Sequence, residues 1–202
     1  THPYELRDHL ALIRCGKPFD SLDRDTRERF LASVDQRFRI VHRTFDDVAH
    51  RIGWLEEMVY SLAVRDGCKL IVVDPWNELE HLPEPGESMT NYINWALQRM
   101  RQIAEALEVH IAIVAHPKKM GETFKPPTGY DVADSAAFFN KPSLGVTVHQ
   151  REDDDGEPYV ELSVWKVRNR RLYGFYKGRT KVSFDITTQT YGPYQRAHEA
   201  AE

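Results

Sequence analysis

The sequence predicts an α/β fold in which a mostly parallel sheet is flanked by helices and followed by an antiparallel meander. Two apolar runs, residues 69–74 (K-L-I-V-V-D) and 109–116 (V-H-I-A-I-V-A-H), are separated by a stretch with helical spacing. Three later segments, 144–150, 159–167 and 181–186, alternate apolar and polar residues. Continuous apolar runs indicate strands buried on both faces of a parallel sheet, whereas alternation indicates antiparallel strands with one wet face.

The first part of the chain is predicted to be helical. Residues 4–13 and 25–38 carry apolar side chains at helical spacing and are separated by Gly-Lys-Pro at 16–18. Residues 38–41 are a candidate for a short strand.

The segments around the first apolar run predict helices and a loop. Asp46 and Asp47 suit the N-terminal caps of an amphipathic helix that extends through residues 52–62. After the run, residues 77–88 contain acidic residues and prolines and predict a surface loop, and Thr90 is expected to open the next helix.

Composition favours one folded domain. With 202 residues, 41% hydrophobic and 29% charged, the chain can bury a substantial core, and we expect one domain over residues 1–195 with a polar tail at 196–202. A formal net charge of −4 does not by itself indicate a nucleic-acid binder. A local basic patch or a ring-shaped assembly could still supply the required field.

The two cysteines, Cys15 and Cys68, lie far apart without metal-type spacing, so the sequence implies neither a disulfide framework nor a zinc site. No apolar run approaches the roughly 20 residues that span a bilayer, and the first residues do not resemble a signal peptide. We therefore expect a soluble protein without a membrane partner, in the cytoplasm, the nucleoid or a phage-infected cell. A mitochondrial location is less favoured.

Asp74 is the first candidate for chemistry because it stands where the first apolar run ends. The carboxyl edge of parallel strands is where open α/β sheets bind ligands, and an acid there orients magnesium in nucleotide hydrolases. The alternative is an aspartate that only caps a helix or closes a turn.

Five motifs occur in a fixed order, and a closing aromatic strand follows them: K-L-I-V-V-D (69–74), V-A-H-P-K-K (114–119), Y-D-V-A-D-S (130–135), V-H-Q-R (148–151) and W-K-V-R-N-R (165–170). Their order and spacing resemble the RecA-type motor domain of hexameric replicative helicases, of the kind found in phage primase-helicases, Twinkle and, more distantly, DnaB. The resemblance extends from about residue 38 to about residue 191. It implies a RecA-like P-loop NTPase core.

The resemblance also implies catalytic roles. Asp74 matches the Walker B aspartate, which holds magnesium through water, and His116 matches the residue that senses the γ-phosphate. Lys166 and Arg168 match a basic pair on one strand face, with Arg168 as an arginine finger for the adjacent subunit's nucleotide. Without the resemblance, His116 could simply cap a strand, and the basic pair could be a solvated face.

Binding roles follow in the same way. Arg151 and Phe184 match positions that flank the nucleotide base, although Phe184 could equally be a core residue. DNA contacts are implied for the loops at 77–90, 117–134 and 153–158, although the acidic run 153–155 is a poor surface for phosphates. The candidates for phosphate contact are Lys118, Lys119, Lys125, Asn140 and Lys141.

The sequence contains no Gly-x-x-x-x-Gly-Lys-Ser/Thr loop. Gly16 and Lys17 are followed by Pro18 and cannot open a helix as a phosphate loop must. We therefore expect the central P-loop strand and the catalytic glutamate of the family to lie upstream.

The sequence thus predicts part of an ATP-dependent replicative DNA helicase motor that uses ATP, or another NTP, with magnesium. Single-stranded DNA, a hexameric ring of identical subunits and a primase domain or partner are the implied associations. The alternatives are another RecA-type ATPase, such as a recombinase or clock-type protein, and a non-catalytic nucleic-acid-binding or assembly module with the same fold. The lack of a phosphate loop favours the last, whereas Lys166 and Arg168 favour the helicase.

Overall fold

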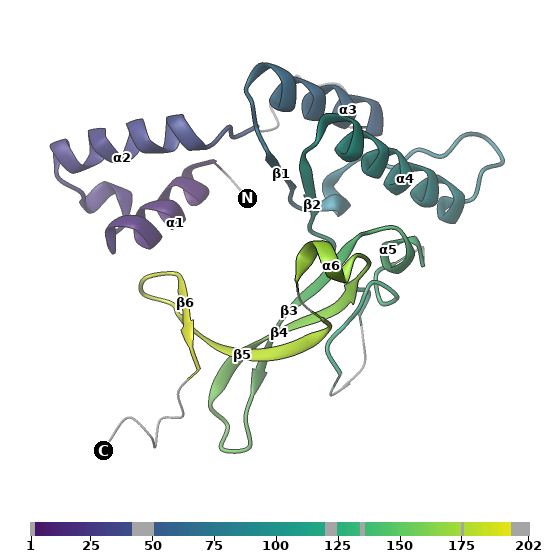
Figure 1. Ribbon diagram of the computed structural model, residues 1–202. Helices are drawn as coiled ribbons and strands as arrows, with labels where there is room; N and C mark the ends of the chain where they lie inside the picture. Colours follow the sequence, from purple (N-terminus) through teal and green to yellow (C-terminus); the bar gives the residue numbers. More distant parts are fainter. Residues whose placement is uncertain (1–2, 42–50, 120–124, 134–135, 175, 195–202) are drawn as a thin grey trace. The chain divides into compact units, whose positions relative to one another are not determined.

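The computed structural model describes residues 3–41, 51–119, 125–133, 136–174 and 176–194 (Figure 1). The chain divides into two compact units. The first comprises Thr1–Thr44, Gln150–Leu162 and Thr180–Glu202, and the second comprises Phe45–His149 and Ser163–Arg179. The predicted caps Asp46 and Asp47 and the predicted tail at 196–202 lie outside the described residues.

The first unit begins with two helices, α1 (Pro3–Cys15) and α2 (Arg24–Arg37), joined through the 3-10 turn η1 (Phe19–Ser21). The side chain of Asp23 caps α2 by accepting a hydrogen bond from the backbone N–H of Thr26 (2.9 Å). Both helices confirm the apolar spacing in the sequence. Their shared core is small and consists of Ala11, Phe19, Leu22 and Phe30.

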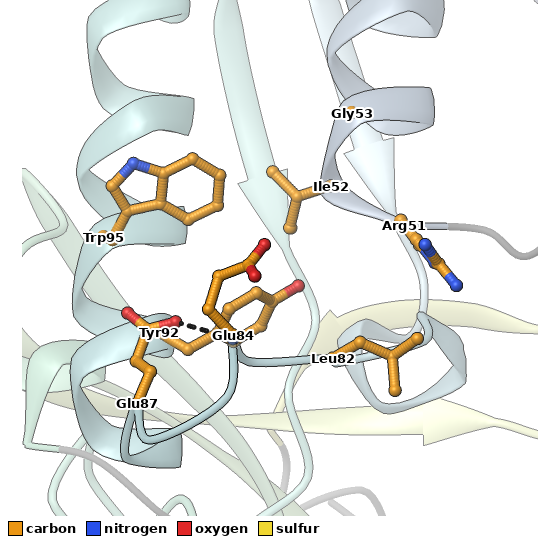
Figure 2. A pocket seen from close by; sticks show the side chains of 8 residues that line it. All are labelled: Arg51, Ile52, Gly53, Leu82, Glu84, Glu87, Tyr92 and Trp95. Atoms are coloured by element: carbon orange, nitrogen blue, oxygen red, sulfur yellow. Dashed lines mark hydrogen bonds between the residues drawn. The ribbon is translucent and has the colours of Figure 1, made fainter.

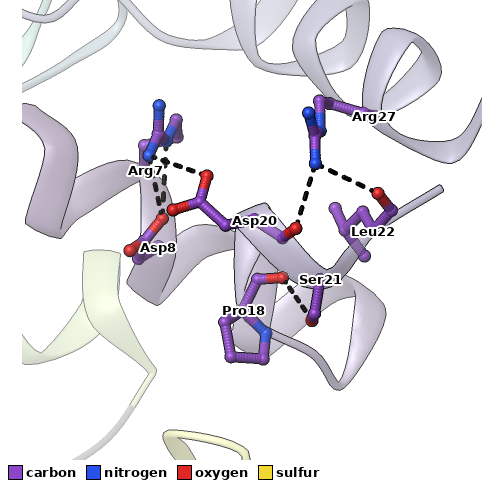
Figure 3. Close-up of polar contacts among 7 residues, drawn as sticks. All are labelled: Arg7, Asp8, Pro18, Asp20, Ser21, Leu22 and Arg27. Carbon is purple, nitrogen blue, oxygen red and sulfur yellow. Dashed lines mark hydrogen bonds and ion pairs between the residues drawn. The ribbon is translucent and has the colours of Figure 1, made fainter. Parts of the chain in front are cut away.

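Two arginines fix the connection between these helices (Figure 3). The guanidinium of Arg7 lies 4.0 Å from the centre of the Phe19 ring and 3.8 Å from the carboxylate of Asp20. Arg27 donates hydrogen bonds to the carbonyl oxygens of Asp20 (3.1 Å) and Leu22 (3.2 Å). Cation–π contacts and charge-assisted hydrogen bonds therefore hold a turn that has little apolar surface of its own.

The short strand predicted at residues 38–41 is wrong, because these residues form no strand in the structure. Phe38 instead ends α2, and its backbone N–H donates to the carbonyl of Val34 (2.8 Å). Phe38, Ile40 and Val41 are exposed. Extended, apolar residues become a strand only when another strand supplies hydrogen-bond partners, and no described strand lies against them.

The second unit contains a strand–helix–strand arrangement. Strand β1 (Leu70–Val73) pairs in parallel with β2 (His110–Ile113), and helix α4 (Met89–Leu107) connects them. Helix α3 (Ile52–Tyr60), which continues into the π-helical turn η2 (Ser61–Arg65), precedes β1. This arrangement confirms the predicted parallel core.

The main core lies between these helices and one face of the strands. It consists of Ile52, Leu55, Val59, Ile71, Val73, Trp76, Tyr92, Ile93, Ala96, Leu97, Met100, Ala137 and Phe138. No helix among the described residues is long and apolar enough to cross a membrane.

The prediction that β1 is buried on both faces is wrong. Ile71 and Val73 are buried, but Leu70 and Val72 retain 59% and 56% exposure. Because side chains alternate along a strand, the core helices cover one face, and no described element covers the other.

The segment between β1 and α4 follows the prediction closely. It is a loop apart from the 3-10 turn η3 (Trp76–Glu78). Ser88, rather than Thr90, marks the start of α4, since its hydroxyl accepts a hydrogen bond from the N–H of Asn91 (3.2 Å).

The predicted antiparallel meander is confirmed. Strands β3 (Leu144–Glu152), β4 (Pro158–Val167), β5 (Gly178–Asp185) and β6 (Thr190–Pro193) form a four-stranded sheet in sequential order. Two short helices flank this region: α5 (Ala137–Asn140) precedes β3, and α6 (Arg170–Tyr173) follows β4.

The core of the second unit can be tested with two matched valines. We expect Val59→Ala, at a side chain with 0% exposure, to lower the free energy of unfolding by about 2 kcal/mol, because it removes buried methyl groups and leaves a cavity. Val64→Ala, at a side chain with 58% exposure, should change it by less than about 0.5 kcal/mol. Urea denaturation of both variants measures the difference, and equal losses would contradict this core assignment.

Candidate functional site

The structure brings Asp74 and His116 to the same edge of the parallel pair. Asp74 directly follows β1, and His116 lies three residues beyond β2. The N–H of Val114 donates to the carbonyl of Val73 (2.9 Å), and the N–H of Trp76 donates to the carbonyl of Val114 (2.8 Å). The two segments therefore remain joined beyond the strands, at the carboxyl edge where α/β sheets bind ligands.

A side-chain contact that the sequence did not indicate strengthens this junction. The backbone N–H of His116 donates to Oδ1 of Asn77 at 3.4 Å, a long hydrogen bond. Asn77 belongs to η3, which is anchored by the buried Trp76 ring stacked on His81 with centroids 4.9 Å apart. The one signal for Asn77 was its position three residues after Asp74 in a segment predicted to be a loop.

The donor chemistry of Asp74 fits magnesium bound through water. Its carboxylate is exposed and takes part in none of the hydrogen bonds found among the described residues. Magnesium in nucleotide sites keeps several waters and needs only one or two protein carboxylates together with phosphate oxygens. Within the described part of the chain, no group of three or more His, Cys, Asp or Glu side chains could hold a metal ion.

Lys166 and Arg168 meet at the carboxyl end of α5. The Lys166 ammonium donates to the carbonyl oxygens of Phe139 (2.5 Å) and Asn140 (2.8 Å). Arg168 donates to the same Asn140 carbonyl (2.6 Å) and to that of Lys141 (3.3 Å). Both cations thus lie on one side of the chain, as their spacing predicted, and satisfy carbonyls that a helix end leaves free.

The closeness of these two cations affects the lysine. Burial, followed by the positive charge of Arg168, lowers the pKa of Lys166 from its usual value. Both causes disfavour the charged ammonium. The pair is therefore an electrostatically tense site that would be relieved by a nearby anion.

Three aromatic rings, which we call the Tyr130 stack, lie beside this basic pair. Tyr130 stacks on Phe139 with ring centroids 3.9 Å apart and planes at 15°, and Phe139 stacks on Trp165 at 5.2 Å and 19°. The ammonium of Lys166 lies 5.4 Å from the centre of the Phe139 ring. The rings come from separate segments without shared periodicity, so nothing in the sequence predicted the stack.

The predicted DNA-contacting residues fall into two groups. Lys118 and Lys119 are exposed on a segment that runs antiparallel to the one carrying Tyr130, since Pro117 pairs with Val132 and the N–H of Lys118 donates to the carbonyl of Asp131 (2.9 Å).

The second group lies at the carboxyl end of α5. It consists of Asn140, which is exposed, and Lys141, which donates to Oε1 of Gln98 (3.1 Å). Lys125 is exposed and lies at the start of the segment that leads to Tyr130. Residues 120–124 and 134 of the predicted loop lie outside the described residues.

Arg151 and Phe184 belong to the first unit, whereas Asp74 and His116 belong to the second. The guanidinium of Arg151 forms an ion pair with Glu161 at 3.4 Å, and Glu161 is buried. Phe184 is 41% exposed and lies against Tyr191 with ring centroids 5.0 Å apart. The predicted role of the two residues at a nucleotide base remains a prediction.

The acidic turn that connects β3 and β4 is organised internally. The Asp153 carboxylate accepts hydrogen bonds from the N–H groups of Asp155 (2.9 Å) and Glu157 (3.0 Å) and from the Tyr194 hydroxyl (2.5 Å). Asp154 and Asp155 are exposed. Their charge makes this turn the least suitable of the three predicted loops for a phosphate backbone.

A hollow of about 380 Å³ lies elsewhere in the second unit (Figure 2). It is lined by Arg51, Ile52, Gly53, Leu82, Glu84, Glu87, Tyr92 and Trp95. Tyr92 and Trp95 come from α4, and burial raises the pKa of the Tyr92 hydroxyl. None of the predicted site residues lines this hollow.

The interaction between the two cations gives a pH-dependent prediction. In an NMR titration of ¹³C-methylated lysines, we expect Lys166 to titrate below the usual lysine value. In Arg168→Gln its pKa should rise, because the variant removes a like charge. The exposed Lys119 serves as the control and should not respond to the substitution. An unchanged Lys166 titration in the variant would contradict the coupling.

No family model matches the sequence. The chain is 29% identical over 201 residues to the Twinkle homolog protein, chloroplastic/mitochondrial, of Arabidopsis thaliana, and the alignment covers 93% of this chain. It spans 28% of that relative's length.

Solved structures show a similar fold. A DnaB-like helicase ATPase domain superposes with a TM-score of 0.71 at 13% identity, covering 96% of this chain and 72% of that one. A second structure, a DnaB-like replicative helicase, gives 0.70 at 13% identity (96% and 49%), and a KaiC-like protein of Pyrococcus horikoshii OT3 gives 0.58 at 14% (96% and 73%). The chain thus has a RecA-like P-loop ATPase fold and resembles a Twinkle homologue in sequence, as its five motifs predicted.

Proposed function

We propose that this chain is part of an ATP-driven replicative DNA helicase motor. The observation that carries the proposal is the placement of Asp74 and His116 at one carboxyl edge of β1 and β2, joined by hydrogen bonds beyond the strands. The likeness to a Twinkle homologue and to DnaB-like helicase structures supports the same class. Because the 202 residues contain no phosphate-binding loop, the proposal requires that loop to come from outside this sequence.

In this proposal Asp74 orients the water ligands of a magnesium ion, which neutralises phosphate charge when it is bound with ATP. The exposed carboxylate at the edge of the sheet suits that role. His116 lies beside it and can hydrogen-bond a phosphate oxygen through its imidazole.

The path from this edge to the nucleic-acid side is short. Pro117, which follows His116, pairs with Val132, and Lys118 and Lys119 come next. A shift of the His116 backbone on loss of a phosphate contact would therefore move both the basic residues and the segment that carries Tyr130. This direct covalent link is what supports coupling of hydrolysis to DNA movement.

Arg168 is proposed to act on the nucleotide of a neighbouring subunit. Its guanidinium is exposed and held by two neutral carbonyl oxygens. A phosphate is a stronger acceptor for arginine because the hydrogen bond is charge-assisted on both sides. A developing negative charge could therefore draw Arg168 away from α5, and Lys166 would remain to satisfy the carbonyls of Phe139 and Asn140.

The second candidate function is a RecA-type ATPase that does not unwind DNA. The KaiC-like structure favours it, although the TM-score of 0.58 is lower than the 0.71 and 0.70 of the helicase structures. A non-catalytic assembly module is the third candidate, and the lack of a phosphate loop favours it. Measuring ATP hydrolysis by the full-length protein with and without single-stranded DNA separates all three.

The proposed partners follow from the same likeness. We propose a hexameric ring of identical subunits on single-stranded DNA, with a primase domain or partner. Expected cellular locations are not tested by the fold. The chloroplast and the mitochondrion belong to the printed name of the Arabidopsis relative alone.

The arginine finger can be tested by substitution in the full-length protein. We expect Arg168→Ala to lower DNA-stimulated ATP hydrolysis by about 10³-fold with little change in nucleotide binding, because the guanidinium stabilises charge in the transition state only. Arg65→Ala, at an exposed arginine paired with Asp66, is the matched control and should retain activity. Retained activity in Arg168→Ala would remove this role.

The magnesium role of Asp74 can be tested at the two ends of one strand. Asp74→Asn should abolish the gain in ATP affinity that magnesium gives the parent protein, because an amide is a poor substitute for a carboxylate near a hydrated cation. Asp66→Asn makes the same change on the amino-terminal side of β1 and should leave that gain unchanged. Calorimetric titrations with magnesium and with EDTA compare the variants, and an equal gain in both would exclude the Walker B role.

A further inference from the structure

The Tyr130 stack ends in an open aromatic ring. One face of Tyr130 lies on Phe139, yet the residue retains 54% exposure. An exposed tyrosine is common, but one that forms the outer layer of three nearly parallel rings is not explained by burial, because the outer ring adds little to the core.

The ring is presented on a tight, well-anchored turn. The Asp131 carboxylate accepts hydrogen bonds from the N–H (2.7 Å) and hydroxyl (3.1 Å) of Thr128, and the Tyr130 N–H donates to that hydroxyl (3.3 Å). Gly129 approaches Phe138 so closely that a Cβ at this position would lie 2.5 Å from the Phe138 carbonyl oxygen. Only glycine therefore allows Tyr130 to reach Phe139.

The inner layers are also fixed. The Trp165 indole N–H donates to the Thr147 hydroxyl (3.1 Å), which itself donates to the carbonyl of Pro127 (2.6 Å). Gly145 packs against the Trp165 ring, where any side chain would collide with it. A ligand that stacks on Tyr130 would therefore meet a preorganised surface and would not have to order it on binding.

Positive charge surrounds this surface on two sides. Lys118 and Lys119 are exposed on the segment that runs antiparallel beside Tyr130. Lys166 lies over the middle ring of the stack. An aromatic platform with flanking cations matches a ligand that has both a flat π face and a phosphate, since sequence-independent binding of single strands combines these two contacts.

We propose that Tyr130 is a stacking platform for one base of single-stranded DNA, while Lys118 and Lys119 contact the adjoining phosphates. This inference rests on the proposed function for the choice of DNA as the ligand. It adds a base contact to a set of candidates that consisted of cations and an amide. Because every base has a π face, the platform would not select a sequence.

The test measures fluorescence anisotropy of labelled oligo(dT), and of an abasic oligonucleotide of equal length, with the full-length protein. We expect Tyr130→Ala to weaken oligo(dT) binding by about 10-fold, within the range of a lost base stack, and to leave abasic binding unchanged. Tyr130→Phe keeps the ring and should bind like the parent. Tyr60→Ala, at another exposed tyrosine of the second unit, is the matched control and should bind both ligands normally.

Lys119→Ala separates the charge contact from the stack. It should weaken both ligands alike and reduce the salt dependence of binding, whereas Tyr130→Ala should leave that dependence unchanged.

Each remaining outcome overturns the proposal in a distinct way. If the parent binds oligo(dT) and Tyr130→Ala binds it equally well, the stacking inference fails and the proposed function stands. If Tyr130→Ala loses both ligands equally, the ring only supports the loop, and the inference again fails. If the parent binds neither ligand, both the inference and the proposed function are overturned.

Discussion

The parallel pairing of β1 with β2 is the constraint on which the candidate site depends. The register from Leu70↔His110 to Val73↔Ile113 ends both strands together, so the residues that follow them leave the sheet at one edge. Hydrogen bonds through Val114 and Trp76 extend the pairing by several residues and fix the start of two loops. A slip of one residue would turn Ile71 and Val73 out of the core and separate Asp74 from His116.

A second organising point is the carboxyl end of α5. Its carbonyl oxygens accept hydrogen bonds from Lys166 and Arg168, and the ring of Phe139 forms the middle layer of the Tyr130 stack. The same four-residue helix therefore holds the basic pair and the aromatic surface together. Such a short helix has little stability of its own, so these contacts and the packing of Phe138 must maintain it.

Much of the fold was predictable because it depends on local pattern. Helical spacing predicted α1, α2, α3 and α4, and alternation predicted the meander. The two failures have one cause. Residues 38–41 and the outer face of β1 have the composition of a paired strand and a buried surface, yet a strand needs a neighbour and a buried face needs a cover. Neither lies among the described residues, and local sequence cannot report that.

The sequence by itself determined the order of the motifs, the residue types at the strand ends and the spacing that puts Lys166 and Arg168 on one side. Tertiary structure alone decided their company: Asn77 beside His116, the α5 carbonyls beneath the basic pair, and Tyr130, Phe139 and Trp165 in one stack. These partners are between 9 and 39 residues apart in sequence, and each position has many competing neighbours before folding. Long-range packing chooses among them, because only the folded chain fixes which side chains share a volume.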